Sequence, residues 1–293
     1  MEDVLILSAQ RTPIGSVNGA LATYTAPQLG GKAIQGALEK AGVKGEELGE
    51  VVMGNVVSGG VGQAPARQAA IAAGVPVSVG ATTVNKVCGS GLKAVMMVGQ
   101  SIRLGEVSLG VAGGMESMSK APFLLDKARA GYRYGNATMW DSILKDGLID
   151  PYSGGHMGDC GEVCAETHAL TREMQDEYAV RTYQRAIEAQ NGGAFANEIV
   201  AVDGIAADEE PGRAKLDKVG KLKPAFKATG TITAANASKI NDGAAALVLG
   251  STKVAAGRKP LARIVDWAMH SQEPQWFTTA PAGAIEKLLK KTG

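Results

Sequence analysis

Hydrophobic positions in the first half of the chain alternate between short continuous runs and runs with helical spacing. Three short apolar runs suit buried strands, at 4–8, 51–57 and 107–112. Between them, apolar side chains recur every three or four residues over 27–41 and 92–104, which predicts amphipathic helices. Gly42 and Gly105 follow these helices and are placed to end them. Alternating strands and helices predict a layered α/β fold with a largely parallel sheet.

The pattern changes after residue 119. Residues 120–240 are more polar and less regular, which indicates an insertion that carries surface loops, with one clear helix over 172–190 and Thr171 as its cap. The small apolar run at 243–250 predicts a strand buried on both faces that rejoins the first sheet. The remaining pattern predicts one more strand and one more helix, at 260–267 and 281–291.

Composition narrows the class of protein. The 293 residues include 45% hydrophobic residues, 39 glycines and only 4% aromatics, which suits closely packed α/β layers. With 30 basic and 29 acidic side chains and no basic block, we expect no nucleic-acid partner. No apolar window approaches membrane-spanning length and the start does not resemble a secretory signal. Three cysteines form no disulfide framework, so we expect a reducing, cytoplasmic location.

The most informative stretch surrounds Cys88. Its β-branched residues predict a strand over 82–87, and a Gly-Ser-Gly turn at 89–91 leads into the helix. This order places Cys88 at a helix N-terminus, where free N–H groups and the helix dipole favour a thiolate suited to thioester formation. Position alone leaves a second interpretation open, in which Cys88 is a small buried hydrophobic residue.

The sequence Val-Cys-Gly-Ser-Gly-Leu-Lys at 87–93 resembles the nucleophile motif of the thiolases, the acetyl-CoA acetyltransferase and 3-ketoacyl-CoA thiolase family. Five further motifs of this family recur in its order along nearly the whole chain. They are Arg-Thr-Pro-Ile-Gly at 11–15, Gly-Gln-Ala-Pro-Ala-Arg-Gln at 62–68, Gly-Gly-Met-Glu-Ser-Met-Ser at 113–119, Leu-Lys-Pro-Ala-Phe at 222–226 and Asn-Ala-Ser-Lys-Ile-Asn-Asp-Gly-Ala-Ala-Ala at 236–246. The resemblance implies a layered αβαβα fold in which Cys88 carries the acyl group.

The resemblance also implies a division of the chain. Residues 1–119 and 241–258 would form the N-terminal thiolase half, 120–240 a loop domain that covers coenzyme A, and 259–293 the start of the C-terminal half. The family's Asn-Glu-Ala-Phe, Gly-His-Pro and late Cys-Gly-Gly motifs are not found. In the family these motifs supply an oxyanion-holding Asn, the activating His and an acid/base Cys. We therefore expect an incomplete C-terminal half.

Other residues match the family's coenzyme A pocket. His156 and Met157 match a His-Met-Gly sequence that lines the pantetheine channel, Ala225 and Phe226 match one wall, and Ser238 matches a serine that contacts pantetheine. From the residues alone, His156 could be a surface-loop histidine, Phe226 a core aromatic and Ser238 a turn residue. Coenzyme A thioesters are expected as substrates, with no resident cofactor.

Three polar residues and two cysteines have simpler explanations. Cys160 and Cys164, with His156 and His168 nearby, could suggest half a zinc site, but one helical face carries both cysteines and they pack as small apolar residues. We expect no metal. Glu116 is interpreted as structural, and Asn85 and Lys86 are interpreted as satisfying backbone groups beside the turn.

The resemblance predicts an acyltransferase that reversibly condenses two acetyl-CoA molecules to acetoacetyl-CoA and free CoA, with Cys88 as acyl carrier. A second hypothesis is a catalytically incompetent fragment or CoA-binding remnant, because the base and second-cysteine motifs are absent. A third is a related decarboxylating condensing enzyme, which would use a malonyl thioester. Residues 123–136 resemble the segment through which thiolase dimers pair, so a homodimer or homotetramer is expected.

Overall fold

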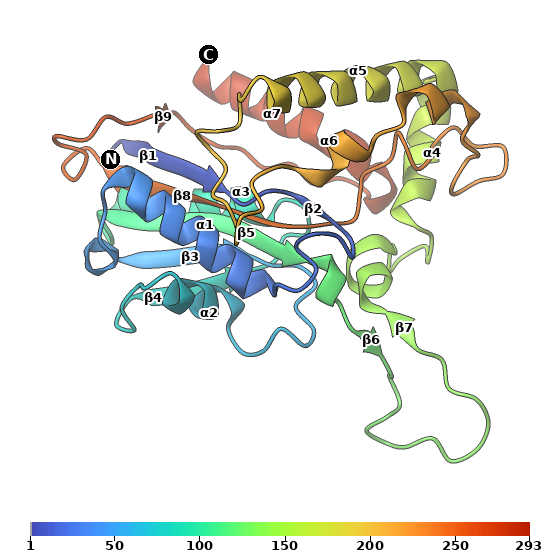
Figure 1. Cartoon of the computed structure of the whole chain (residues 1–293), viewed down its shortest axis with the longest axis horizontal. Helices are drawn as coiled ribbons and strands as arrows, with labels where there is room; N and C mark the ends of the chain where they lie inside the picture. The colour runs from blue at the N-terminus through green and yellow to red at the C-terminus, as the bar shows by residue number, and fades with distance from the viewer. Residues whose placement is uncertain (1) are drawn as a thin grey trace. The chain divides into compact units, whose positions relative to one another are not determined.

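The computed structural model describes residues 2–293, which pack into two compact units (Figure 1). The first, the sheet unit, contains 2–147, 197–207 and 241–264. The second, the loop unit, contains the other segments, 148–196, 208–240 and 265–293. The assignment of 1–119, 120–240, 241–258 and 259–293 to thiolase halves and a loop domain stays a prediction.

The sheet unit is built on a seven-stranded mixed sheet. Its strands are β1 (Val4–Arg11), β2 (Gly15–Ser16), β3 (Glu50–Gly54), β4 (Gly80–Val84), β5 (Leu109–Ser117), β8 (Asn241–Ser251) and β9 (Ala262–Ile264). Six of them follow the order β4-β3-β5-β8-β1-β9, and β2 pairs with β8.

The expected largely parallel sheet needs a correction at β8 and β9. Strand β3 runs parallel to β4 and β5, as βαβ units require. Strand β8 is antiparallel to both of its neighbours, β5 and β1, and β9 is antiparallel to β1. Because β8 returns after a long excursion of the chain and not after a single crossover helix, nothing obliges it to run with the others. The small apolar side chains of β8 nevertheless lie inside the sheet, as predicted.

Helices cover both faces of this sheet. They are α1 (Ala26–Ala41), α2 (Pro65–Ala72) and α3 (Ser90–Leu104). The Thr25 side chain caps the start of α1, while Gly42 and Gly105 end α1 and α3 in the left-handed conformation. The predicted helix ends are therefore confirmed.

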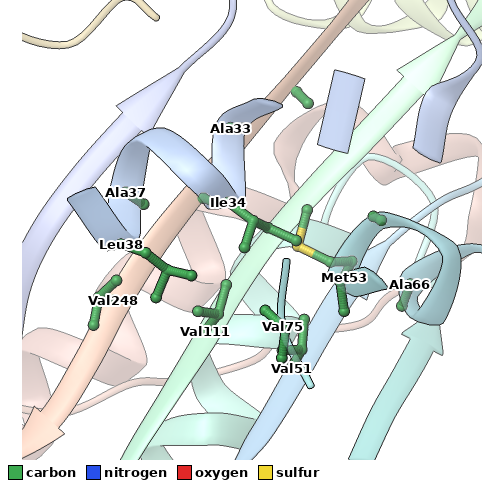
Figure 2. Close-up of a cluster of buried hydrophobic side chains, with 14 of the residues drawn as sticks. Ala33, Ile34, Ala37, Leu38, Val51, Met53, Ala66, Val75, Val111 and Val248 are labelled. Atoms are coloured by element: carbon green, nitrogen blue, oxygen red, sulfur yellow. The ribbon is translucent and has the colours of Figure 1, made fainter. Parts of the chain in front are cut away.

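Two hydrophobic cores lie on opposite faces of the sheet. Val51 and Met53 of β3 pack with α1 and α2 in the larger core (Figure 2). Val52, which lies between them in sequence, packs in the other core with Val98 and Ile102 of α3. Side chains alternate along a strand, so one apolar run fills both cores. The observed layers confirm the α/β class and bring the α3 N-terminus next to Gly54, the last residue of β3.

The loop unit has little sheet. Its helices are α4 (Met157–Thr167), α5 (Arg172–Asn191), α6 (Glu209–Arg213) and α7 (Ala280–Thr292), with 3₁₀ turns at Leu216–Lys221 and Pro274–Thr279. The Thr171 hydroxyl caps α5, as predicted, and the Gly293 N–H bonds to the Leu289 carbonyl at the end of α7.

Short elements complete the chain. They are the hairpin strands β6 (Phe123–Leu124) and β7 (Trp140–Asp141), 3₁₀ turns at Gly45–Glu47 and Met118–Lys120, and a π-helical turn at Leu144–Leu148. None of the helices formed within residues 2–293 combines the length and apolar character needed to cross a bilayer.

Candidate functional site

Cys88 lies exposed on the turn between β4 and α3. The residue before it, Val87, has a φ of 47°. A β-branched side chain disfavours this left-handed conformation, so the backbone is strained beside the thiol. This exposure does not fit the interpretation of Cys88 as a buried core residue, and the role of Cys88 as acyl carrier stays a prediction.

Side chains and backbone within the turn maintain its shape. The buried Ser90 hydroxyl donates to the Val87 carbonyl at 2.6 Å and accepts from the Lys86 N–H at 2.8 Å. The Asn85 Oδ1 accepts from the Val87 N–H at 2.9 Å, and the Gly89 N–H bonds to the Lys86 carbonyl at 3.1 Å. The predicted backbone role of Asn85 is confirmed, and Ser90 is a supporting residue that the sequence analysis missed.

Glycines let the α3 N-terminus approach the sheet. A Cβ added at Gly54, the last residue of β3, would lie 2.6 Å from the Ser90 Cβ and 2.9 Å from its carbonyl carbon. On β5, a Cβ at Gly114 would lie 3.5 Å from the Gly91 Cα. The thiol is therefore positioned at the carboxyl ends of parallel strands, where open α/β sheets place ligands.

Glu116 supports the loop that follows β3. Its carboxylate accepts from the Asn55 Nδ2 at 2.8 Å, the Val56 N–H at 2.9 Å and the Val57 N–H at 3.3 Å. Burial raises the pKa of Glu116, and these hydrogen bonds act in the opposite direction. The structural interpretation of Glu116 is confirmed by these contacts.

In the loop unit, His156 and Phe226 lie together. Their ring centroids are 4.7 Å apart with an interplanar angle of 27°. His156 is the N-cap of α4, and its Nδ1 accepts from the Gly158 N–H at 2.9 Å. This bond assigns the ring hydrogen to Nε2, which is then the available donor. Met157 is half-buried at the first position of the helix.

A buried carboxylate holds the segment that carries Phe226. The Glu162 oxygens accept from the Thr231 and Ile232 N–H groups, each at 2.9 Å, and from the Thr231 hydroxyl at 3.0 Å. The Ile232 carbonyl in turn accepts from the Ala225 N–H at 2.8 Å. The sequence analysis also missed Glu162. The available signal was the position of this glutamate on a short helix, two residues after Cys160.

Ser238 is exposed in the turn that follows Thr233 and lines a cavity of about 820 Å³. The Asn236 side chain shapes this turn, since its Oδ1 accepts from the Thr233 N–H at 2.7 Å and its Nδ2 donates to Asp176 of α5 at 3.0 Å. His156 and Phe226 are not among the residues that line this cavity. The structure thus pairs two of the predicted pocket residues and places Ser238 at a separate hollow of the same unit, while Cys88 belongs to the sheet unit.

The two remaining cysteines lie on α4. Cys160 is buried and Cys164 half-buried, and burial raises the pKa of the Cys160 thiol. Within residues 2–293, no three His, Cys, Asp or Glu side chains are grouped so that they could hold a metal ion.

Known proteins match this chain in sequence and in structure over nearly its whole length. The family described as "Thiolase, N-terminal domain" matches residues 4–253. A probable acetyl-CoA acetyltransferase of Dictyostelium discoideum is 48% identical over the whole chain, which covers 73% of that protein. A mitochondrial acetyl-CoA acetyltransferase of Rattus norvegicus is 51% identical over the whole chain, which covers 72% of it.

Solved structures agree. The crystal structure of the Acat5 thiolase from Ascaris suum in complex with coenzyme A superposes on the whole chain with a TM-score of 0.96 and 42% identity, and 78% of that chain is covered. The order of motifs, the layered sheet and these matches lead to one conclusion: the chain belongs to the thiolase family of enzymes.

Proposed function

We propose that the protein is an acyl-CoA C-acyltransferase that reversibly joins two acetyl-CoA molecules into acetoacetyl-CoA and free CoA. The observation that carries this proposal is the exposed Cys88 thiol, held on a strained turn at the carboxyl ends of parallel strands. The acetyl-CoA acetyltransferase names of several relatives support the choice of substrate.

In the first half-reaction, the Cys88 sulfur attacks the thioester carbonyl of acetyl-CoA. The carbon–sulfur bond to coenzyme A then breaks, leaving acetyl-Cys88, and the thiol proton ends on the released CoA sulfur. Backbone N–H groups in the first turn of α3 are the candidate donors for the oxyanion that forms.

In the second half-reaction, a base removes a proton from the methyl carbon of another acetyl-CoA. The carbanion attacks the acetyl-Cys88 carbonyl, a carbon–carbon bond forms, and Cys88 leaves and regains a proton. The family resemblance assigns this proton transfer to the acid/base Cys of a late Cys-Gly-Gly motif, which is not found in residues 1–293. This chain therefore contributes the acyl carrier and not, on this assignment, the base.

The loop unit would bind the pantetheine part of the acyl-CoA substrate. The stacked His156 and Phe226 rings offer a flat wall with an Nε2 donor, Met157 and Ala225 adjoin them in sequence, and Ser238 offers an exposed hydroxyl. Coenzyme A enters as a substrate, so these residues belong to a substrate pocket and not to a cofactor site.

Peptide mass mapping after incubation with acetyl-CoA tests the acyl intermediate. We expect one acetyl group on the peptide that contains Cys88, none in Cys88→Ala, and an unchanged adduct in the control Cys164→Ala. Loss of the nucleophile should lower turnover by at least about 10³-fold. A wild-type protein that forms acetoacetyl-CoA without acetyl-Cys88 would disprove the mechanism.

The missing base motif favours a second candidate, in which the chain binds CoA or carries an acyl group without condensing it. This candidate predicts CoA binding or acetyl-Cys88 formation without acetoacetyl-CoA, so product analysis of the same reaction separates the two.

We also propose a cytoplasmic homodimer or homotetramer. Free thiols and a relative named as cytosolic support the compartment, although mitochondrial relatives exist as well. Cell fractionation and light scattering test these points.

A further inference from the structure

The Lys239 side chain folds back over the turn that carries Ser238. Its Nζ donates to the carbonyl oxygens of Ala234, Ala235 and Ala237, at 3.3 Å for Ala235 and 3.1 Å for Ala237. An ammonium group has three N–H donors, so three converging carbonyls use all of them. One side chain therefore binds three carbonyl groups of the turn.

The location of this ammonium is unusual for a lysine. Lysines generally keep the charged end in water. Lys239 is half-buried, and burial lowers the pKa of its amine while Glu210 acts in the opposite direction. Its Nζ lies 5.7 Å from the centre of the Tyr183 ring, whose hydroxyl donates to Glu210 at 3.0 Å. The cost of removing the Lys239 ammonium from water is offset only while its hydrogen bonds to the three carbonyl oxygens are retained.

Without the ammonium, the conformation of the turn would be unfavourable. Carbonyl oxygens that point at one another repel, and leaving a partly buried acceptor unpaired costs free energy. The Asn236 side chain also binds the turn, through hydrogen bonds to Thr233 and Asp176. Ser238 lies between Ala237, which accepts from Lys239, and Lys239 itself, so both neighbours of the serine are fixed.

We infer that Lys239 is a positioning residue whose ammonium serves as a built-in cation for this turn and presets Ser238 for the polar groups of an acyl-CoA. The inference rests on the proposed function, because it takes Ser238 as a contact of the substrate. Lys239 itself contacts the backbone of the turn, and no covalent step involves it.

Three variants test the inference. Lys239→Met retains the length of the side chain but removes the ammonium, and Lys239→Ala leaves space for an added alkylammonium ion. Lys227→Met is the control, since Lys227 is an exposed lysine of the same unit that pairs with Glu166. The measurements are KM and kcat for acetyl-CoA and, without substrate, hydrogen exchange at the Ala235 and Ala237 amides.

For Lys239→Met we expect KM to rise about tenfold with kcat within about twofold, because hydrogen bonds to a charged group are lost from the turn. Exchange at both amides should be faster in the substrate-free variant. In Lys239→Ala, n-propylammonium should restore KM, whereas tetramethylammonium, which has no N–H donor, should not. Lys227→Met should match wild type.

Unchanged amide exchange in Lys239→Met would overturn the positioning role whatever the enzyme's substrate is. Faster exchange with an unchanged KM would show that the turn is fixed by Lys239 but does not serve the acyl-CoA, and this also overturns the inference. Failure of the proposed function is distinct, because wild type would then form no acetoacetyl-CoA and show no KM to compare, whereas amide exchange would still report on the turn.

Discussion

The two units hold their candidate residues by different means. In the sheet unit, Ser90 and Asn85 bond locally within the Cys88 turn, and close contacts at glycines seat the turn on a sheet with a hydrophobic core on each face. In the loop unit, few side chains are buried, and α5 buries only Ala179 among its residues. There the segments around Phe226 and Ser238 are held by one carboxylate, one amide and one ammonium.

This difference implies opposite vulnerabilities. A turn fixed by close packing is disturbed when atoms are added, because the backbone has no room to yield. A turn fixed by polar side chains is disturbed when atoms are removed, because buried partners lose their hydrogen bonds. Variants of each kind therefore test whether the two units are built as described.

The largest effect is expected for Gly54→Ala in the sheet unit. The new methyl group would lie 2.6 Å from the Ser90 Cβ and displace the start of α3, together with Cys88. A shift of about 1 Å can cost about 100-fold in rate, so acylation of Cys88 should slow by about that factor. Stopped-flow measurement of CoA release reports this rate.

Gly80→Ala is the matched control, because Gly80 opens β4 and nothing lies within 4 Å of its added Cβ. Its acylation rate should equal that of wild type. Equal rates for both variants would show that close packing at Gly54 does not position the thiol.

In the loop unit, Glu162→Ala should lower the free energy of unfolding by about 3 kcal/mol. The change removes the acceptor of the Thr231 and Ile232 N–H groups and leaves them unpaired inside the protein. Urea denaturation followed by circular dichroism measures the loss.

Glu166→Ala, one turn later on the same helix, is the comparison variant. Its exposed pair with Lys227 should contribute little to stability, because solvent screens it. If Glu162→Ala were as mild as Glu166→Ala, the loop unit would not depend on its buried carboxylate.

Much of the sheet unit could be predicted from hydrophobic periodicity and helix caps. Buried apolar runs marked β1, β3, β5 and β8, and Gly42 and Gly105 marked two helix ends, because each signal is local. The direction of β8 could not be predicted, since a strand that returns after a long excursion is oriented by tertiary packing. The strained φ of Val87 could not be predicted either, because the surrounding fold imposes it and a valine does not indicate a left-handed conformation.

The candidate site was predictable only where chemistry or family motifs marked it. Cys88 was singled out in that way, and its role as acyl carrier stays a prediction; the structure shows only that it is exposed. Glu162 and Lys239 were missed, because charged residues on a helix or in a turn are usually solvated, and only the folded chain shows which backbone groups they bind. Their partners are distant in sequence for Glu162 and adjacent for Lys239, so one rule would not have found both.

A smaller effect should follow from Gly158→Ala. An added Cβ would lie 2.3 to 2.4 Å from the Phe226 ring, so the ring must swing away from His156. Loss of an aromatic stack costs about 1 kcal/mol, which predicts a KM for acetyl-CoA about fivefold higher. Steady-state kinetics measures the change.

Thermal unfolding separates this effect from damage to α4. Alanine is favoured over glycine inside a helix by about 1 kcal/mol, so stability should not fall. Phe226→Ala should raise KM to a similar degree by a different route. A normal KM in both variants would remove the stacked pair from the substrate pocket.

The smallest effect concerns the pH dependence of stability at Glu116. Burial raises the pKa of Glu116 above its ordinary value of 4.5, so between that value and the raised pKa the folded protein holds a proton that the unfolded chain has lost. The contribution of Glu116 to stability should therefore be complete below pH 4.5 and decline as the pH rises through the raised pKa. One group cannot exceed a slope of about 1.4 kcal/mol per pH unit.

Denaturation of wild type and Glu116→Gln at a series of pH values isolates this slope, because the variant cannot ionise there. The stability of wild type relative to Glu116→Gln should fall as the pH rises. A difference that moves the other way would mean that the donors on Glu116, namely Asn55, Val56 and Val57, outweigh burial. The sheet unit would then hold the loop after β3 with charged hydrogen bonds, as the loop unit holds its own segments, and the contrast between the two units would narrow to the glycine contacts at Gly54.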